Sequence, residues 1–501
     1  MNHRVTTKGN AMKRSLITLA CASLVTTMVV ADQSTDELRR EFEAYKKATE
    51  ARMADLEKKA QAPSAAKNGA SPADSLTTKE IETIRERMDG RALTFGFYGY
   101  FRSGLGVDDD GKAQSAFRAP NADAKYRLGN EAETYAETGF SSKSKLKDDD
   151  TVSFNSYILL AYVTPNANNS SYEATTSLRE AYAEAAGTLE WNKSTVFWAG
   201  QRYHSRYDVH MNDFYYRDMS GFGGGFSDML LPDGTTKLGL AWLGGSVDKL
   251  NSNGTGFFDD DGQFNKNSLD LTISEIPLPG GSLDAMLTVS HFEGDSITNS
   301  TGYLELNSNW GASVGLVYTT KLRDGKRNRL VAQYGQGSAY NFKSIMTLPT
   351  ALDYSVIDSV DVNNMQTIRF LDEIACNLSE RWTLQGVAIY QNSDIGTEED
   401  NNVTWISFGL RPAYHFNRFF SIETEFGYDY TDTENAESGD LFKVTIAPQI
   451  TPDMDVFSRP SLRVFLTYAS WDDDFRGLVG VPSYTEDTSG ISAGVQVETW
   501  F

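Results

Sequence analysis

Acid–base side chains gather in one short segment, QRYHSRYDVHMNDFYY, which covers residues 201–216. His204, Asp208 and His210 are residue types that transfer protons in enzymes. Hydrolysis also needs a nucleophile or a second acid in a defined cleft, and no activated serine accompanies this segment. The chain has 5 histidines, and Cys376 is its only cysteine beyond residue 31. The sequence therefore favours neither catalysis nor a transition-metal site.

Binding chemistry fits the residues better, because aromatic and charged side chains alternate with apolar ones in several segments. In LTFGFYGYFRSGLG (93–106), Tyr100 and Arg102 share a face opposite the phenylalanines. The final segment, ISAGVQVETWF, puts Trp500 on the same face as Glu498. Strict alternation of this kind predicts strands whose two faces meet different solvents.

Two further segments are expected to repeat this pattern. AKYRLGNEAETYAETGF would place Arg127, Glu131, Glu133, Tyr135 and Glu137 on one face, and VFSRPSLRVFLTYASW would place Phe457, Arg459 and Arg463 on one face. A ring beside carboxylates and guanidiniums suits a pyranose, whose CH face stacks while its hydroxyls form hydrogen bonds. An aromatic girdle against lipid would lie on the opposite face, with the leucines. If such strands line a pore, each contact must stay weak, because a pore has to release what it binds.

The elements that would position these residues are the strands of a transmembrane antiparallel β-barrel. No segment after residue 31 approaches twenty consecutive apolar residues, so helical spans are excluded. Aromatic residues make up 12% of the chain, which contains 41 glycines, and it ends on Phe501, as such barrels often do. Residues 93–501 are enough for sixteen to eighteen strands. A half-buried edge strand of a soluble protein is the alternative explanation of the last segment alone.

The residues before the barrel divide into three segments. Residues 1–31 contain MKRSLITLACASLVTTMVVA, which predicts a removable secretory signal; its apolar run is too short for a comfortable membrane anchor. Residues 32–60 have a narrow apolar stripe, typical of a coiled-coil helix. Residues 61–92 form a small-residue linker followed by a short helix. We expect the extension to self-associate in the periplasm, and a flexible tail is the alternative.

The charge balance excludes nucleic acid as a partner. The chain carries 46 basic and 68 acidic residues, a formal net charge of −22. Acidic clusters occur at 108–110, 148–150, 259–261 and 398–400, and we expect them to be solvated loop tips. No cofactor is expected, although a structural calcium ion in one of these clusters is an alternative.

Five segments closely resemble the maltoporin family of outer-membrane sugar porins. They are GYFRSGLG (99–106), AKYRLGNEAETYAE (124–137), WAGQRYHSRYDVHMNDFYY (198–216), FSRPSLRVFLTYASW (457–471) and the ending ETWF. The amino-terminal extension resembles that of sucrose porins, a branch of the same family. The resemblance implies an eighteen-stranded barrel in the bacterial outer membrane, a homotrimer, and passive diffusion of oligosaccharides such as maltodextrins or sucrose along an aromatic slide.

The resemblance also assigns roles to individual residues. The slide would comprise Tyr100, Tyr135, Phe457 and Trp500, with Tyr172 reaching in from a neighbouring subunit. The polar track beside the slide would comprise Arg102, Arg127, Glu137, Arg179, Arg206, Asp208 and Asp213. Tyr215 and Asp218 match the narrowest point, which the family places on an inward-folded loop.

Three departures from the family pattern affect the expected site. Ala116 and Ala132 stand where the family has two cysteines of a loop disulfide, so that loop must be held in another way. Arg327, in RDGKRNRL, stands where a further slide phenylalanine is expected. Tyr172 and Phe457 replace tryptophans, which should weaken stacking. The sugar preference of the family therefore does not transfer.

Two other functions compete with a sugar channel. A general or anion-preferring porin would use six arginines as a basic ladder: Arg102, Arg127, Arg179, Arg206, Arg459 and Arg463. Current block by added sugar separates that function from a sugar channel. Alternatively, the helical extension is a cell-wall tether and the barrel is its anchor.

Overall fold

The computed structural model describes residues 91–146, 148–165, 175–245, 266–298, 303–322, 326–345, 359–396, 402–434 and 437–501. These residues all belong to one compact unit, Glu82–Phe501. The predicted signal, the coiled-coil segment, almost all of the linker segment 61–92, and Tyr172 lie outside the described residues. Among the described residues, none form a helix long and apolar enough to cross a bilayer.

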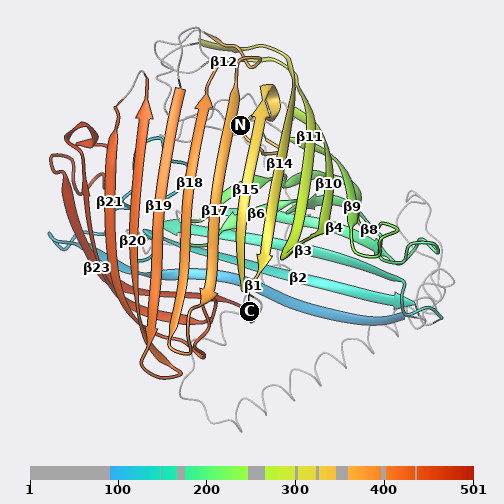
Figure 1. Ribbon diagram of the computed structural model, residues 1–501, viewed down its shortest axis with the longest axis horizontal. Coiled ribbons are helices and arrows are strands. Elements are labelled where there is room, and N and C mark those ends of the chain that lie inside the picture. The colour runs from blue at the N-terminus through green and yellow to red at the C-terminus, as the bar shows by residue number, and fades with distance from the viewer. Residues whose placement is uncertain are drawn as a thin grey trace, which may run out of the picture. The chain divides into compact units, whose positions relative to one another are not determined.

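Eighteen antiparallel strands form one closed barrel, as the sequence predicts (Figure 1). Each strand pairs with the next along the wall, and β23 pairs with β1 to close it. The barrel strands are β1 (Arg91–Asp108), β2 (Glu133–Leu146), β3 (Ser153–Pro165), β4 (Thr175–Ala186), β5 (Val196–Arg202), β8 (Gly221–Leu230), β9 (Lys237–Gly245), β10 (Lys266–Leu278), β11 (Gly281–Phe292), β14 (Asn309–Lys321), β15 (Arg327–Gln336), β17 (Gln366–Asn377), β18 (Trp382–Asp394), β19 (Asn402–His415), β20 (Phe420–Thr433), β21 (Gly439–Ile450), β22 (Ser461–Trp471) and β23 (Ser489–Trp500).

Shorter elements occupy the connections between barrel strands. They are the hairpin β6 (Arg206–Val209) and β7 (Phe214–Asp218), a small sheet of β12 (Asp295–Thr298), β13 (Tyr303–Leu306) and β16 (Ser359–Val360), and the one-turn helices η4 (Gly337–Ala339) and η5 (Asp473–Phe475). Most connections alternate in length along the chain: residues 109–132 and 203–220 are long, whereas 279–280 and 378–381 are tight turns. Long and short connections therefore gather at opposite ends, which we call the loop end and the turn end.

The two faces of the wall differ as the alternation predicts. Apolar side chains such as Phe95, which is 75% exposed, and Leu462 cover the outer face. Polar side chains such as Glu425, Lys443 and Thr445 are fully buried on the inner face. Because Glu425 and Lys443 lie away from bulk water, these charges pair with each other and with backbone groups.

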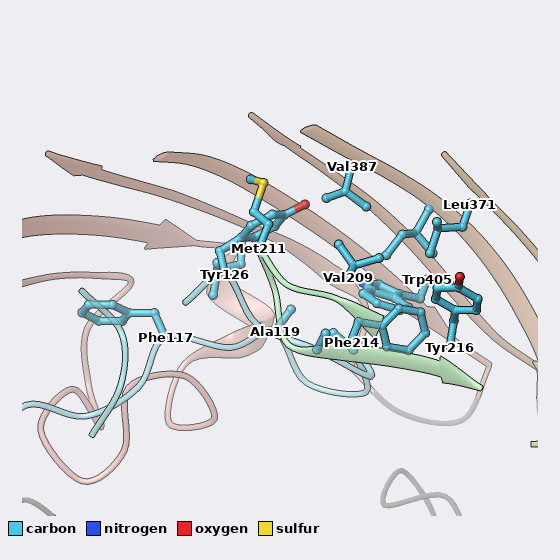
Figure 2. Close-up of a cluster of buried hydrophobic side chains, with 14 of the residues drawn as sticks. Phe117, Ala119, Tyr126, Val209, Met211, Phe214, Tyr216, Leu371, Val387 and Trp405 are labelled. Carbon is cyan, nitrogen blue, oxygen red and sulfur yellow. The ribbon is translucent and has the colours of Figure 1, made fainter. Parts of the chain in front are cut away.

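A hydrophobic cluster inside the barrel holds the inward-folded segments against the wall. Figure 2 shows Val209, Phe214 and Tyr216 beside Leu371, Val387 and Trp405. The Phe214 ring meets Trp405 edge-on, with centroids 5.1 Å apart. This cluster fixes the β6–β7 hairpin inside the lumen.

Two strand boundaries differ from the sequence expectation. Alternation predicts that residues 126–131 continue the strand that carries Tyr135, but β2 begins only at Glu133. Residues 457–459 likewise precede β22, which begins at Ser461. In both cases the residues lie in a connection. They form hydrogen bonds with side chains in the lumen instead of pairing with a neighbouring strand.

Candidate functional site

The connection between β1 and β2 folds into the lumen and is anchored there by charges. The Leu128 amide donates to Glu425 Oε1 at 3.1 Å, and the Leu128 carbonyl accepts from Lys443 Nζ at 2.7 Å. The Tyr126 hydroxyl lies 2.7 Å from the Ser407 hydroxyl. Backbone groups that lack a strand partner thus find one on the inner wall, as burial requires.

The connection between β5 and β8 is anchored in the same way, through its carbonyl oxygens. Arg411 donates to Met211 O at 2.7 Å, Arg369 donates to Tyr216 O at 2.8 Å, and Gln333 donates to the same oxygen at 3.0 Å. These donors come from the inner faces of β15, β17 and β19. The loop is therefore a fixed part of the pore wall.

The β6–β7 hairpin and β2 form a group of rings and charges across the pore. The Arg206 guanidinium packs against both Tyr203 and Tyr215, with its Cζ 4.1 Å and 3.9 Å from the ring centroids. It also pairs with Asp218 at 3.3 Å. Burial raises the pKa of the Tyr215 phenol, which therefore stays protonated at neutral pH.

Glu137 connects this group to the wall. Its Oε1 accepts from the Tyr135 hydroxyl at 2.5 Å and from the Tyr203 hydroxyl at 2.7 Å. One carboxylate on β2 thus fixes a ring on its own strand and a ring on the inward-folded segment. Because Glu137 holds the hydroxyl end of each side chain in place, both rings keep a defined orientation in the lumen.

A cluster of paired charges stands beside these rings. Arg102 contacts Glu131 and Glu133 at 2.6 Å each, and Arg127 contacts Glu131 at 2.7 Å and Glu498 at 3.2 Å. Glu498 also pairs with two further arginines, Arg459 at 2.8 Å and Arg463 at 3.2 Å. The cluster places acceptors and donors for hydroxyl groups side by side along the wall.

Aromatic side chains follow one line next to this cluster. The Tyr135 and Tyr100 ring centroids are 6.2 Å apart, and Tyr100 is the register partner of Trp500. The His210 ring lies 5.7 Å from Trp500 and 6.1 Å from Phe457. Four ring positions predicted from sequence are therefore brought together, with His210 filling the space between the last two.

The LamB porin family model matches residues 95–501. The chain belongs to the LamB porin family. It is accordingly a channel protein with multiple strands crossing the bacterial outer membrane. In such barrels the short turns face the periplasm and the long loops face the exterior, which orients the turn end and the loop end.

Three solved structures are similar in fold to this LamB-family porin at low sequence identity. OccAB1 of Acinetobacter baumannii has 10% identity and a TM-score of 0.44, covering 81% of this chain and 97% of that chain. OccD3 of Pseudomonas aeruginosa has 12% identity and a TM-score of 0.40, covering 83% and 92%. An anion-selective porin from Comamonas acidovorans has 9% identity and a TM-score of 0.39, covering 82% and 100%.

At the periplasmic mouth of the porin, the turn between β21 and β22 reaches across the opening. Lys326 pairs with Asp455, and the Arg327 guanidinium lies 5.7 Å from the Phe457 ring centroid. In the wall, β17, β18, β19 and β20 stand between β15 and β21. The turn therefore crosses the mouth from β21 toward β15. It brings Phe457 beside Arg327, which stands at the end of the aromatic line.

The remaining predicted residues take different positions. Arg179 is the residue left without a register partner at a bulge in β4. Asp213 lies 3.8 Å from Arg102, and the Asp208 carbonyl accepts a hydrogen bond from Arg329 at 2.5 Å. Tyr172 lies outside the described residues. Phe457 lies in the turn between β21 and β22, and the other predicted residues lie on the inner wall or on the two inward-folded segments.

The histidines of the 201–216 segment contact different groups. His204 Nε2 lies 3.2 Å from Asp270 Oδ2, whereas His210 faces Arg127, Arg459 and Glu498. Burial holds the pKa of His210 well below its usual value, and the neighbouring guanidiniums lower it further against the effect of Glu498. His210 is therefore a neutral ring at physiological pH.

Two residues of the site carry no clear sequence signal. Tyr203 stands between Arg202 and His204, directly after β5 ends, so alternation does not assign its face. The residue type of His210 indicates proton transfer and not a ring contact. Its aromatic contacts depend on how the 203–220 connection folds, which local patterning does not predict.

The acidic clusters are solvated or locally bonded where the structure describes them. Asp108 Oδ1 accepts from the backbone amides of Asp110 at 3.1 Å and Lys112 at 2.7 Å. Hydrogen bonds from Thr151 and Lys193 lower the pKa of Asp149 to about 2. Within the described ranges, no three His, Cys, Asp or Glu side chains gather as a metal site. Residues 259–261 and 398–400 lie outside those ranges.

Proposed function

We propose that this porin conducts linear oligosaccharides by facilitated passive diffusion, with maltose, maltodextrin or sucrose-type sugars as the substrate class. The observation that carries the proposal is that the line of aromatic side chains contacts the cluster of paired charges. The Tyr100 hydroxyl accepts from Arg127 at 2.7 Å and donates to Glu498 at 3.0 Å, and Arg102 lies 4.9 Å from the Tyr135 centroid.

This arrangement suits a pyranose for a physical reason. The CH face of the sugar stacks on the exposed side of each ring, while its hydroxyls exchange hydrogen bonds with the neighbouring carboxylates and guanidiniums. Successive rings offer similar sites, so a sugar moves between them without a deep energy minimum. Tyr215, Arg206 and Asp218 would set the narrowest point.

The test is block of ion current through the purified porin in a planar bilayer. Linear glucose oligomers and sucrose should each reduce the current at millimolar or lower concentration, with longer oligomers blocking at lower concentration. Equal currents with and without every sugar would contradict the proposal. The same recordings in salts of different anion and cation size give the ion selectivity.

A general or anion-preferring porin is the second candidate, and its support is the series of lumen arginines. Five of the six have carboxylate partners, and these are Arg102, Arg127, Arg206, Arg459 and Arg463. Paired charges attract free anions less than isolated ones. A high anion-to-cation permeability ratio without sugar block would favour this second function.

The family also supports a homotrimer, with Tyr172 contributed to the neighbouring pore. A monomer in native-like detergent, measured by light scattering, would contradict it. We further propose that the sucrose-porin-like extension, residues 32–60, self-associates in the periplasm. Deleting residues 35–75 should leave conduction intact, whereas a tether function would be lost with the same deletion.

A further inference from the structure

The inner wall formed by β1, β3 and β4 carries a second group of rings. Tyr157 on β3 and Tyr182 on β4 are register partners, and their ring centroids are 4.7 Å apart with planes inclined by 13°. Tyr98 on β1 lies over Gly139 of β2. A Cβ atom added to Gly139 would come within 2.4 Å of the Tyr98 ring, so the ring lies directly on the glycine. We call Tyr98, Tyr157 and Tyr182 the periplasmic tyrosines.

The register places these tyrosines on the periplasmic side of the constriction. Glu137, which holds Tyr135 and Tyr203, pairs with Ala161 on β3. Tyr157 lies four residues nearer the periplasmic turn, a separation of roughly 13 Å along the strand. Its neighbours Phe154 and Ile158 are exposed on the outer face, so Tyr157 lies on the lumen side.

Charged side chains accompany the periplasmic tyrosines, as they do along the main ring line. The Arg202 Cζ lies 4.9 Å from the Tyr182 centroid, and its Nη1 lies 3.4 Å from Glu184 Oε1. Glu184 also interacts with the Tyr157 phenol. The Tyr157 and Tyr182 rings stack on each other, and both side chains are only partly buried.

We propose that the periplasmic tyrosines form an additional pyranose subsite, which a linear oligosaccharide occupies after it passes the constriction. This inference rests on the proposed sugar-channel function. Tyr98 and Tyr100 are successive inward positions of β1, so a sugar on Tyr100 can move directly to Tyr98 and then to Tyr157. This path of the sugar leads away from Arg327, the cationic residue at the end of the aromatic line.

The experiment measures block of ion current by a linear glucose hexamer in the full-length porin. Stacking on one ring changes affinity by about twofold to tenfold. Tyr157→Ala should therefore raise the half-blocking concentration of the hexamer by that factor. Tyr157→Leu keeps an apolar side chain but not the flat ring, and should show the same loss. Tyr157→Phe should stay within about twofold of the wild type.

The matched control is Tyr162→Ala on the same strand, because Tyr162 is 38% exposed on the outer face. It should leave sugar block unchanged. If the hexamer blocks Tyr157→Ala and Tyr157→Leu as well as it blocks the wild type, the subsite is refuted while the sugar channel stands. If the hexamer does not block the wild type, the proposed function itself fails.

Discussion

Asn130 and Phe117 are joined by two hydrogen bonds that run in opposite directions. The Phe117 amide donates to Asn130 Oδ1 at 2.8 Å, and Asn130 Nδ2 donates to the Phe117 carbonyl at 2.7 Å. The same Nδ2 donates to Tyr126 O at 2.9 Å. This side chain closes the loop in which the family carries a disulfide, close to Ala116 and Ala132. Ala116 and Ala132 cannot form a disulfide, so other contacts must hold this loop. The side-chain amide of Asn130 makes such contacts.

Replacing Asn130 should therefore loosen the loop. Asn130 is 1% exposed, so Asn130→Ala leaves buried backbone groups without partners and costs about 2 kcal/mol of loop stability. We expect faster proteolysis within residues 115–130 and larger fluctuations of open-channel current. Asn192→Ala is the matched control, since Asn192 also makes several hydrogen bonds, but in a periplasmic turn. Equal current noise in the two variants would contradict this role of Asn130.

The barrel strands and the faces of Tyr100 and Trp500 could be predicted because alternation is a local signal, whereas Phe457 lies in a turn to which strand parity does not apply. Tyr100 and Trp500 lie in regular strands, so parity alone gives their face. The inward-folded segments could not be predicted in this way. Tyr126 packs on Gly409 and Gly427, where a Cβ would come within 2.1 Å and 2.2 Å of its ring. Such contacts depend on residues about 280 to 300 positions apart, which no local period reports.

Tyr215→Ala should raise ion conductance and reduce discrimination between sugars. Its ring packs against Arg206 in the β6–β7 hairpin, so its removal widens the pore and frees the guanidinium. Single-channel conductance and permeability ratios for sugars of different bulk measure both effects. Tyr215→Phe keeps the ring and should conduct like the wild type. Unchanged conductance in Tyr215→Ala would remove this ring from the narrowest point.

Trp500→Ala should weaken sugar block without closing the pore. The Arg459 Cζ lies 4.6 Å from the Trp500 centroid, and the ring is the largest in the aromatic line. We expect the half-blocking concentration of maltotriose to rise by about twofold to tenfold, the energy of one stacking contact. Trp242→Ala, which removes an exposed outer-wall ring, is the control. If the two variants behave alike, substrate does not contact Trp500.

Arg327→Phe should extend the aromatic line to the periplasmic mouth. The new ring would lie near Phe457 and add one stacking surface, lowering the half-blocking sugar concentration by about twofold to tenfold. The variant should fold, because Glu373, which lies 3.8 Å from Arg327, keeps its closer partner Arg329. Arg327→Gln removes the charge without adding a ring, and so separates the two effects. If Arg327→Gln improves sugar block as much as Arg327→Phe does, the cation itself impedes the sugar and stacking at this position contributes nothing.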